Sequence, residues 1–372
     1  MSLIIIGIGI YMVLLAVKHI YAKNWAKGLA VDISLSESKV YPGSEVVLTE
    51  TIVNCKWLPL PMIHVKFAID RELRFAGDVD NMTVSDKNYK CDVFSLLFYQ
   101  KITRKLPFTC LKRGYYHIGD VDVVSTDLFM KNVVSVTIPV NQDLVVYPEV
   151  FDSEMVDIPY RRIMGTILTK RYTWEDPFEF RGIREYQSYD TMKYINWKAS
   201  AKTGQLKVNT FENTSAQEVS IWLNVEDEGI WVYDDLKEKS ISLACSLSCR
   251  LLEQGIAVSM ISNGEDRICG ETLFVESGCD GGHRDTIVNG LARIDLRKKT
   301  KNFEKLFEEV HLRISPKAML VMISFSKRRV LQERFCKLQE TFGDSLWVLP
   351  YLSGMDSELE LIDEAKVIRL EL

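Results

Sequence analysis

The chain has 372 residues, which is too long for one ordinary hydrophobic core and suits two domains. Hydrophobic residues make up 47% of it and charged residues 26%, a composition that excludes a disordered chain. A net charge of −5 excludes the basic balance that is typical of a general nucleic-acid-binding protein.

The first predicted element is a transmembrane anchor over residues 1–24. Leu3 to Val17 is almost purely apolar, and Lys18 can snorkel and lengthen a run that is short for a bilayer. No positive residue precedes the apolar run, which disfavours a secretory signal peptide, whereas Lys23 and Lys27 follow it. By the positive-inside rule this predicts a single-pass protein of the cell membrane with its bulk in the cytoplasm. An inverted anchor would place the following domain outside.

Residues 31–148 show alternating apolar and polar positions and predict an immunoglobulin-like β-sandwich. Turn signals such as Pro42-Gly43, Trp57 to Pro61 and Ile118 to Asp120 separate the strands. The predicted strands are Val46 to Ile52, Ile63 to Ile69, Cys91 to Lys101, Tyr115 to Val124 and Asp143 to Tyr147.

A central block over residues 170–215 follows a boundary that is expected near Pro148 to Thr169. Asp190 precedes a helical stretch and is expected to cap it, while Gly204 is expected to end that helix. The periodicity of Met192, Ile195 and Ala199 predicts that these side chains face a core.

The central block is rich in charge, and two interpretations stay open. Arg181, Arg184, Lys202 and Lys207 flank the helix and suit an anionic partner surface or a phosphate. Alternatively, an internal network of ion pairs fixes the loop. Its members would be Arg181, Arg184, Glu185, Asp190 and Glu212.

Residues 216–372 alternate between strand and helix patterns and predict a parallel sheet with helices on both faces. Strands are predicted at Val219 to Leu223, Ile256 to Ile261, Thr272 to Val275, Ala318 to Ser324 and Leu346 to Tyr351. Helices are predicted at Tyr233 to Gln254, His283 to Ile294, Phe303 to Ile314 and Lys327 to Phe342.

Common catalytic and metal-binding motifs are absent from the sequence. It has no P-loop, no HExxH and no GxSxG pattern, and its five histidines fall in different predicted elements. None of its eight cysteines has CxxC spacing, which excludes a zinc knuckle. The prediction is therefore a protein that is not an enzyme and needs no cofactor. A metal-dependent hydrolase that uses Glu185, Asp190 and Glu212 is the enzymatic alternative.

The central block resembles the signature of the domain-of-unknown-function-58 (DUF58) family. The matching residues are Arg184-Glu185-Tyr186, Tyr189-Asp190, the run from Trp197 to Gly204, and Phe211-Glu212. Members of the family often carry glycine at the position of Tyr189. Arg113 to Tyr116 and Asp127-Leu128-Phe129 are similar to strand ends of the sandwich in such proteins.

The resemblance implies a von Willebrand factor A-like domain over residues 216–372, which makes the predicted fold α+β and multidomain. In that fold an Asp-x-Ser-x-Ser loop after the first strand supplies the oxygen ligands that a hard cation needs. The corresponding positions are Asn224, Glu226 and Glu228, a degenerate set for which no bound metal is expected.

The resemblance also implies a function: a membrane-anchored, non-catalytic adaptor that works with a MoxR-type AAA+ ATPase in the assembly or maturation of a target complex. No nucleic-acid partner and no small-molecule substrate are expected. A structural component of the cell envelope is a further alternative. The expected partner-binding residues are Arg181, Arg184, Tyr186, Asp190, Trp197, Lys198 and Lys202.

Overall fold

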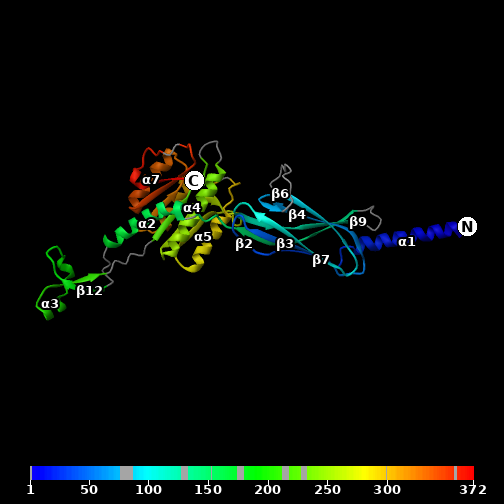
Figure 1. Ribbon diagram of the computed structural model, residues 1–372, viewed down its shortest axis with the longest axis horizontal. Helices are drawn as coiled ribbons and strands as arrows, with labels where there is room; N and C mark the ends of the chain where they lie inside the picture. The colour runs from blue at the N-terminus through cyan, green and yellow to red at the C-terminus, as the bar shows by residue number, and fades with distance from the viewer. Residues whose placement is uncertain are drawn as a thin grey trace. The chain divides into compact units, whose positions relative to one another are not determined.

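The computed structural model describes residues 2–75, 87–126, 133–151, 153–173, 180–211, 218–227, 233–298, 300–355 and 358–372. The chain divides into two compact units, residues 1–149 (unit 1) and 150–372 (unit 2). An apolar N-terminal helix precedes several sheets with interspersed helices, which confirms the predicted α+β class (Figure 1).

Helix α1 (Ser2–Asn24) opens unit 1. From Ile5 to Asn24 it is long and apolar enough to cross a membrane. Its C-terminal end is part of the folded unit, because Tyr21 and Trp25 are buried in the core that the strands of unit 1 form. The helix leaves from one end of those strands (Figure 1).

The rest of unit 1 consists of strands in three sheets. Their orders are β1-β3-β7-β5, β10-β9-β4-β6 and β2-β11-β8. The strands are β1 (Leu29–Leu35), β2 (Lys39–Val40), β3 (Glu45–Asn54), β4 (Leu60–Asp70), β5 (Leu73–Phe75), β6 (Lys87–Leu96), β7 (Lys101–Cys110), β8 (Gly114–Ile118), β9 (Val121–Thr126), β10 (Val133–Ile138) and β11 (Gln142–Val146).

Period-two alternation builds the core of unit 1. Along β3 every second side chain is buried, and Leu48 and Ile52 point inward. Ile63 and Val65 of β4 in the second four-stranded sheet contribute to the same apolar cluster. Burial of this cluster, rather than the intrinsic preference of any one strand, stabilises the sheets.

Two strand predictions in unit 1 were wrong. The stretch 91–101 is not one strand, because β6 ends at Leu96 and a turn held by Gln100 leads into β7: the Leu97 N–H donates to Gln100 Oε1 at 2.8 Å. The stretch 115–124 is two strands, β8 and β9, with Gly119 and Asp120 between them. The strand expected at 143–147 is β11.

Unit 2 contains a two-stranded sheet, β12-β13, and a six-stranded sheet of order β16-β15-β14-β17-β18-β19. In the larger sheet only β16 is antiparallel to its neighbour. The elements are α2 (Ser153–Thr173), β12 (Phe180–Glu185), α3 (Trp197–Thr203), β13 (Lys207–Phe211), β14 (Glu218–Leu223), α4 (Asp234–Glu253), β15 (Ala257–Glu265), β16 (Thr272–Gly278), α5 (Gly281–Arg293), α6 (Phe303–Val310), β17 (Met319–Ile323), α7 (Arg329–Phe342), β18 (Ser345–Tyr351) and β19 (Val367–Glu371).

Both faces of the six-stranded sheet are covered, as its apolar strands require. Trp222 of β14 stacks on Phe307 of α6 with ring centroids 4.5 Å apart, and Phe335 of α7 belongs to the same core cluster. The neighbouring Ile221 points to the other face and is also fully buried, and α4 packs against β14 and β15. The predicted alternation of strands and helices is thus confirmed for this sheet.

Helix α2 and strand β19 were not predicted. Helix α2 lies where a boundary was expected and is tied to the end of the chain, because Arg162 donates to the carbonyl oxygen of Ala365 at 2.6 Å. It also contacts α4 through an ion pair between Asp157 and Arg250. The helix is therefore part of the fold of unit 2 rather than a linker.

Candidate functional site

The described part of the central block is a strand-helix-strand unit. Strands β12 and β13 pair antiparallel, and α3 lies between them in sequence. Ile195 and Val208 are buried and bridge the helix-side segment to β13. Gly204 ends α3 with φ +70°, a left-handed conformation that favours glycine, so this prediction is confirmed.

The predicted start of the helix was wrong. Helix α3 begins at Trp197, and its cap is Asn196, whose side-chain oxygen accepts a hydrogen bond from the Ala199 N–H at 3.0 Å. Only a short 3₁₀ turn precedes it, and Met192 in that turn is exposed rather than facing a core. Asp190 cannot cap a helix that starts seven residues later.

Asp190 has another partner in the block. Its two carboxylate oxygens accept hydrogen bonds from the two terminal nitrogens of Arg184, at 2.6 and 2.5 Å, and one also accepts from the Gln187 N–H at 2.8 Å. The Arg184 hydrogen bonds hold the pKa of the Asp190 carboxyl below its usual value. This bidentate pair closes the loop after β12, as the internal ion-pair interpretation expects.

Polar side chains that the sequence analysis did not single out fix α3 to β13. The Ser200 hydroxyl donates to the Asn196 carbonyl and accepts from the Lys207 N–H, both at 2.8 Å. The Asn196 side chain donates to Asn209 Oδ1 at 2.7 Å. An asparagine before a helix is a recognisable cap, but spacing in the sequence gives no sign of its bond to Asn209.

Three of the predicted partner-binding side chains are exposed on α3. Trp197 is 67% exposed, and Lys198 and Lys202 are exposed beside it on the same short helix. Tyr186 is half-buried. The Arg181 side chain and Glu212 lie outside the described residues. The structure therefore separates Arg184 and Asp190, which bind each other, from an outward surface of Trp197, Lys198 and Lys202, the α3 surface.

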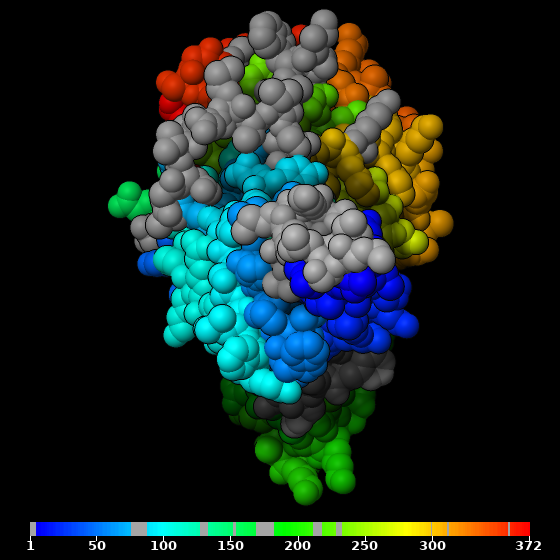
Figure 2. All heavy atoms as spheres, turned by 90° about the vertical axis from the view of Figure 1, so that its right-hand side faces the viewer, coloured from blue at the N-terminus to red at the C-terminus, as the bar shows by residue number. Residues whose placement is uncertain are grey.

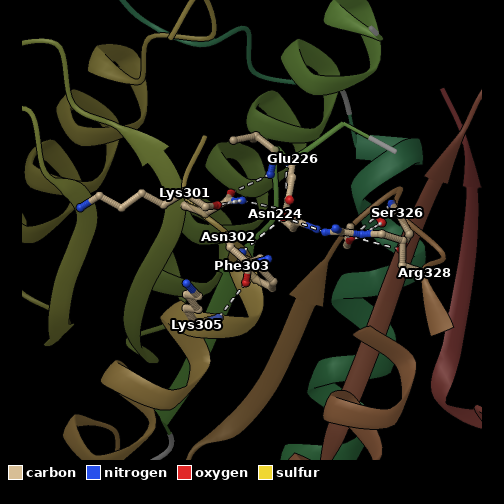
Figure 3. A network of polar contacts seen from close by, with 11 residues as sticks. Asn224, Glu226, Lys301, Asn302, Phe303, Lys305, Ser326 and Arg328 are labelled. Carbon is tan, nitrogen blue, oxygen red and sulfur yellow. Dashed lines mark hydrogen bonds and ion pairs between the residues drawn. The ribbon is translucent and has the colours of Figure 1, made fainter. Parts of the chain in front are cut away.

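The second candidate site lies at the carboxyl ends of the strands of the six-stranded sheet, at its topological switch point. We call this the edge of the six-stranded sheet. Strands β15 and β17 lie on opposite sides of β14, so the segments that follow these strands meet at their carboxyl ends, where open α/β sheets bind ligands. Figure 3 shows Asn224 and Glu226 after β14 close to Ser326 and Arg328 after β17.

Asn224 is buried, and its side chain takes part in three hydrogen bonds at this edge. Its side-chain oxygen accepts from the Glu226 N–H and from the Asn263 side chain, both at 3.0 Å. Its side-chain nitrogen donates to the Ser324 hydroxyl at 3.0 Å. Asn263 in turn accepts from the Val225 N–H at 2.9 Å. These contacts join the ends of β14, β15 and β17.

The acids that follow β14 are each paired with a cation of the chain itself. Glu226 binds the Arg328 guanidinium at 2.7 Å, and Asp227 binds the buried Lys237 ammonium at 2.6 Å. Glu228 lies outside the described residues. A divalent cation needs free oxygen ligands, and here both carboxylates already neutralise internal charges. The described donors therefore do not fit the metal of an Asp-x-Ser-x-Ser loop.

A cavity of about 190 Å³ lies beside these loops at the carboxyl ends of β17 and β18. It is lined by Tyr233, Phe325, Lys327, Leu349, Pro350, Tyr351 and Met355. Pockets that hold drug-sized ligands or cofactors have volumes of roughly 300 to 1,000 Å³. This cavity suits a single side chain better than a cofactor.

The two described carboxylates of the hydrolase alternative each lie beside a cation of the chain, and Glu212 lies outside the described residues. Asp190 binds Arg184, and Glu185 is exposed with Lys207 at 3.4 Å. Among the described residues, no three His, Cys, Asp or Glu side chains form a group suited to a metal ion.

Comparison with known protein families finds no match for this chain, and comparison with curated proteins finds none. Three similar solved structures have TM-scores of 0.20 or below. A CARDB domain from Pyrococcus furiosus is 16% identical and covers 32% of this chain and 91% of its own, with a TM-score of 0.20. The sporulation control protein Spo0M from Bacillus subtilis is 14% identical over 43% of this chain and 58% of its own, at 0.19. A beta-glucosidase from Listeria innocua is 14% identical over 32% of this chain and 16% of its own, at 0.19.

Proposed function

We propose that this chain is a membrane-anchored, non-catalytic interaction protein of the DUF58 type, with an immunoglobulin-like sandwich followed by a von Willebrand factor A-like domain. Helix α1 is its single-pass anchor, and the units that follow lie in the cytoplasm. The partner that the resemblance implies is a MoxR-type AAA+ ATPase, and the joint task is the assembly or maturation of a target complex.

The α3 surface is the observation that carries this proposal. The polar groups around it are used within the block, since Ser200 and Asn196 fix α3, and Arg184 binds Asp190. Trp197, in contrast, leaves a large apolar ring in solvent on the helix that also exposes Lys198 and Lys202. Tryptophan is over-represented among the few residues that dominate binding energy, and lysines beside it favour an acidic partner surface.

The edge of the six-stranded sheet supports a non-catalytic role. Its asparagines and acids stabilise the loops through contacts within the chain. Arg328 binds the Glu226 carboxylate, which a metal-dependent site would need as a free ligand. The cavity beside it is small. These features favour a rigid scaffold over a reaction centre.

The test is capture of partners by the full-length chain, solubilised in detergent after in-cell crosslinking and identified by mass spectrometry. Trp197→Ala is expected to weaken recovery of an AAA+ ATPase at least about tenfold, because it removes a central apolar anchor. The matched control is Leu312→Ala, which removes an apolar side chain that is 82% exposed elsewhere in unit 2. It should recover the ATPase as the unmodified chain does.

Ser200→Ala separates binding from folding of the block. It removes the acceptor of the Lys207 N–H and should increase hydrogen exchange of α3 and β13. Trp197→Ala should leave that exchange unchanged. Equal recovery of the ATPase by the Trp197→Ala and unmodified chains would show that the α3 surface is not the binding site.

A further inference from the structure

Two loops of unit 1 lie directly against the segment that follows α1. We name residues 55–59 and 97–100 the basal loops. The Cys55 N–H donates to the Gly28 carbonyl at 2.7 Å, and the Lys56 ammonium donates to the Lys27 carbonyl at 2.8 Å. The Tyr99 N–H donates to the Lys56 carbonyl at 3.1 Å, which joins the second loop to the first.

Buried Asn54 holds both basal loops from the inside. Its side-chain nitrogen donates to the carbonyl oxygens of Leu58 at 3.0 Å and of Leu97 at 2.8 Å. The loops are therefore built parts of the fold and have a fixed place next to the end of α1. Viewed from that end, the dark blue start of the chain lies beside strands in lighter blue and cyan (Figure 2).

The basal loops expose large apolar side chains. Trp57 is 68% exposed, Leu97 59%, Phe98 61% and Tyr99 70%. A cluster of exposed apolar side chains on a folded unit usually marks a site that binds another protein, a ligand or a membrane. Among the described residues, no polar side chain and no neighbouring strand covers these four side chains.

Backbone strain accompanies this exposure. Tyr99 has φ +53° and is the one non-glycine residue of the described chain with a positive φ. A bulky side chain in the left-handed region is costly, and such strain persists where the surrounding structure imposes it, often at functional sites. The turn thus holds an exposed aromatic ring at a conformational cost that glycine would avoid.

The length of α1 places the basal loops at a membrane surface. Its 23 residues extend for about 34 Å at 1.5 Å per residue, slightly more than the roughly 30 Å of a bilayer's hydrocarbon core. A spanning α1 therefore ends in the interfacial layer, and the loops attach to the residues just after that end. Trp and Tyr are enriched in this layer, and lysines such as Lys23 and Lys27 favour anionic headgroups.

We propose that the basal loops are a second membrane contact, in which Trp57, Phe98 and Tyr99 enter the interfacial layer of the bilayer that α1 spans. The proposal rests on the anchoring role of α1 in the proposed function. A helix alone leaves the unit that it carries free to tilt and rotate. Loops on a fixed part of the same unit hold the strands of unit 1 in one orientation against the lipid surface.

The test uses the full-length chain reconstituted into vesicles of phosphatidylcholine and phosphatidylglycerol. The emission of Trp57 is obtained as the difference between the unmodified chain and Trp57→Phe, and it is measured with lipids brominated at shallow or deep acyl positions. Shallow bromines should quench the Trp57 emission about twofold or more, and deep bromines less, because the ring lies in the interface. The matched control is Trp197, equally exposed at 67% but in unit 2, whose difference emission should not be quenched.

The outcomes separate this proposal from the anchor on which it rests. If the chain floats with the vesicles and resists carbonate extraction while Trp57 stays unquenched, α1 is an anchor and the basal loops do not touch lipid. If the chain does not float, the anchor fails and the loop contact fails with it. Blue-shifted Trp57 emission without quenching would mean that a second copy of the chain covers the loops, which also overturns the proposal.

Discussion

Glu50 is an ionisable residue on the buried, mostly apolar face of β3. It lies on the inward face of β3 with 1% of its surface exposed, and neither carboxylate oxygen has a hydrogen-bond partner among the described residues. Burial, and then the nearby Asp92 carboxylate, raise its pKa to about 7, although Arg104 and Lys90 oppose the shift. Arg104 forms its ion pair with Asp92, at 2.6 Å, rather than with Glu50.

This carboxyl should make the stability of unit 1 depend on pH. Between the ordinary value of 4.5 and about 7 the unfolded chain loses the Glu50 proton while the folded chain keeps it, so ionisation favours unfolding. The free energy of unfolding should fall by about 3 kcal/mol across this range and level off above it. Glu50→Gln should flatten the dependence, as measured by denaturation in detergent from pH 4.5 to 8. An equally steep fall in that variant would assign the effect to other groups.

Tyr99 offers a test of strain at one residue. Tyr99→Gly and Tyr99→Ala both remove the ring, but only glycine adopts φ +53° without cost. The glycine variant should be more stable than the alanine variant by about 1 kcal/mol, as measured by denaturation of the detergent-solubilised chain. Equal stabilities would show that the turn relaxes when the ring is lost.

Predictability differs sharply from residue to residue in the central block. The role of Gly204 follows from its place after a helical run. An ion-pair network of five residues that includes Arg184 and Asp190 was one of two interpretations, and the structure shows this pair. The cap at Asn196 and the double use of Ser200 escaped prediction, because these depend on β13 folding back against α3. Such contacts arise from tertiary structure, which spacing along the chain does not encode.

At the scale of elements, the loops after β14 and β17 are joined by the pair of Glu226 and Arg328. Removing either partner leaves the other charge partly buried, so each single change should destabilise the sheet. Glu226→Gln combined with Arg328→Gln should cost less than the sum of the single changes, with a coupling of about 1 to 2 kcal/mol. Denaturant titration of the four chains gives this coupling, and additive effects would mean that the pair contributes little.

Elements with strong periodicity were predicted well, and those with mixed signals were not. Helix α4 and strands β14, β17 and β18 lie within a few residues of their predicted places because they are continuous apolar or amphipathic runs. Strand β7 was missed because its first half is rich in lysine and arginine, and those charges face outward or pair.

Helix α2 contains a proline, a residue that usually predicts the end of a helix. Pro159 lies inside it and reads as a stop signal, yet Val156, Ile163 and Ile167 are buried at helical spacing. The apolar spacing was the signal that would have found the helix. The proline and the polar residues on the rest of its surface are signals against a helix.

At the scale of the whole molecule, the two units have separate cores and separate proposed tasks. The core of unit 1 includes Tyr21 and Trp25 at the end of α1, so α1 and the sheets of this unit share one core. A core of unit 2 lies between its sheet and helices α6 and α7, around Trp222 and Trp347. Under the two proposals above, membrane contact belongs to the first unit and partner binding to the second.

This division predicts that residues 150–372, produced alone, fold without unit 1. Their cores are built from their own elements, and a compact unit of this kind generally folds by itself. The fragment should give one cooperative thermal transition by circular dichroism and recover the partner of the full-length chain, whereas the same fragment with Trp197→Ala should not. Recovery of that partner by residues 1–149 instead would place binding in the first unit. It would then favour a structural role at the cell envelope over an adaptor that acts through α3.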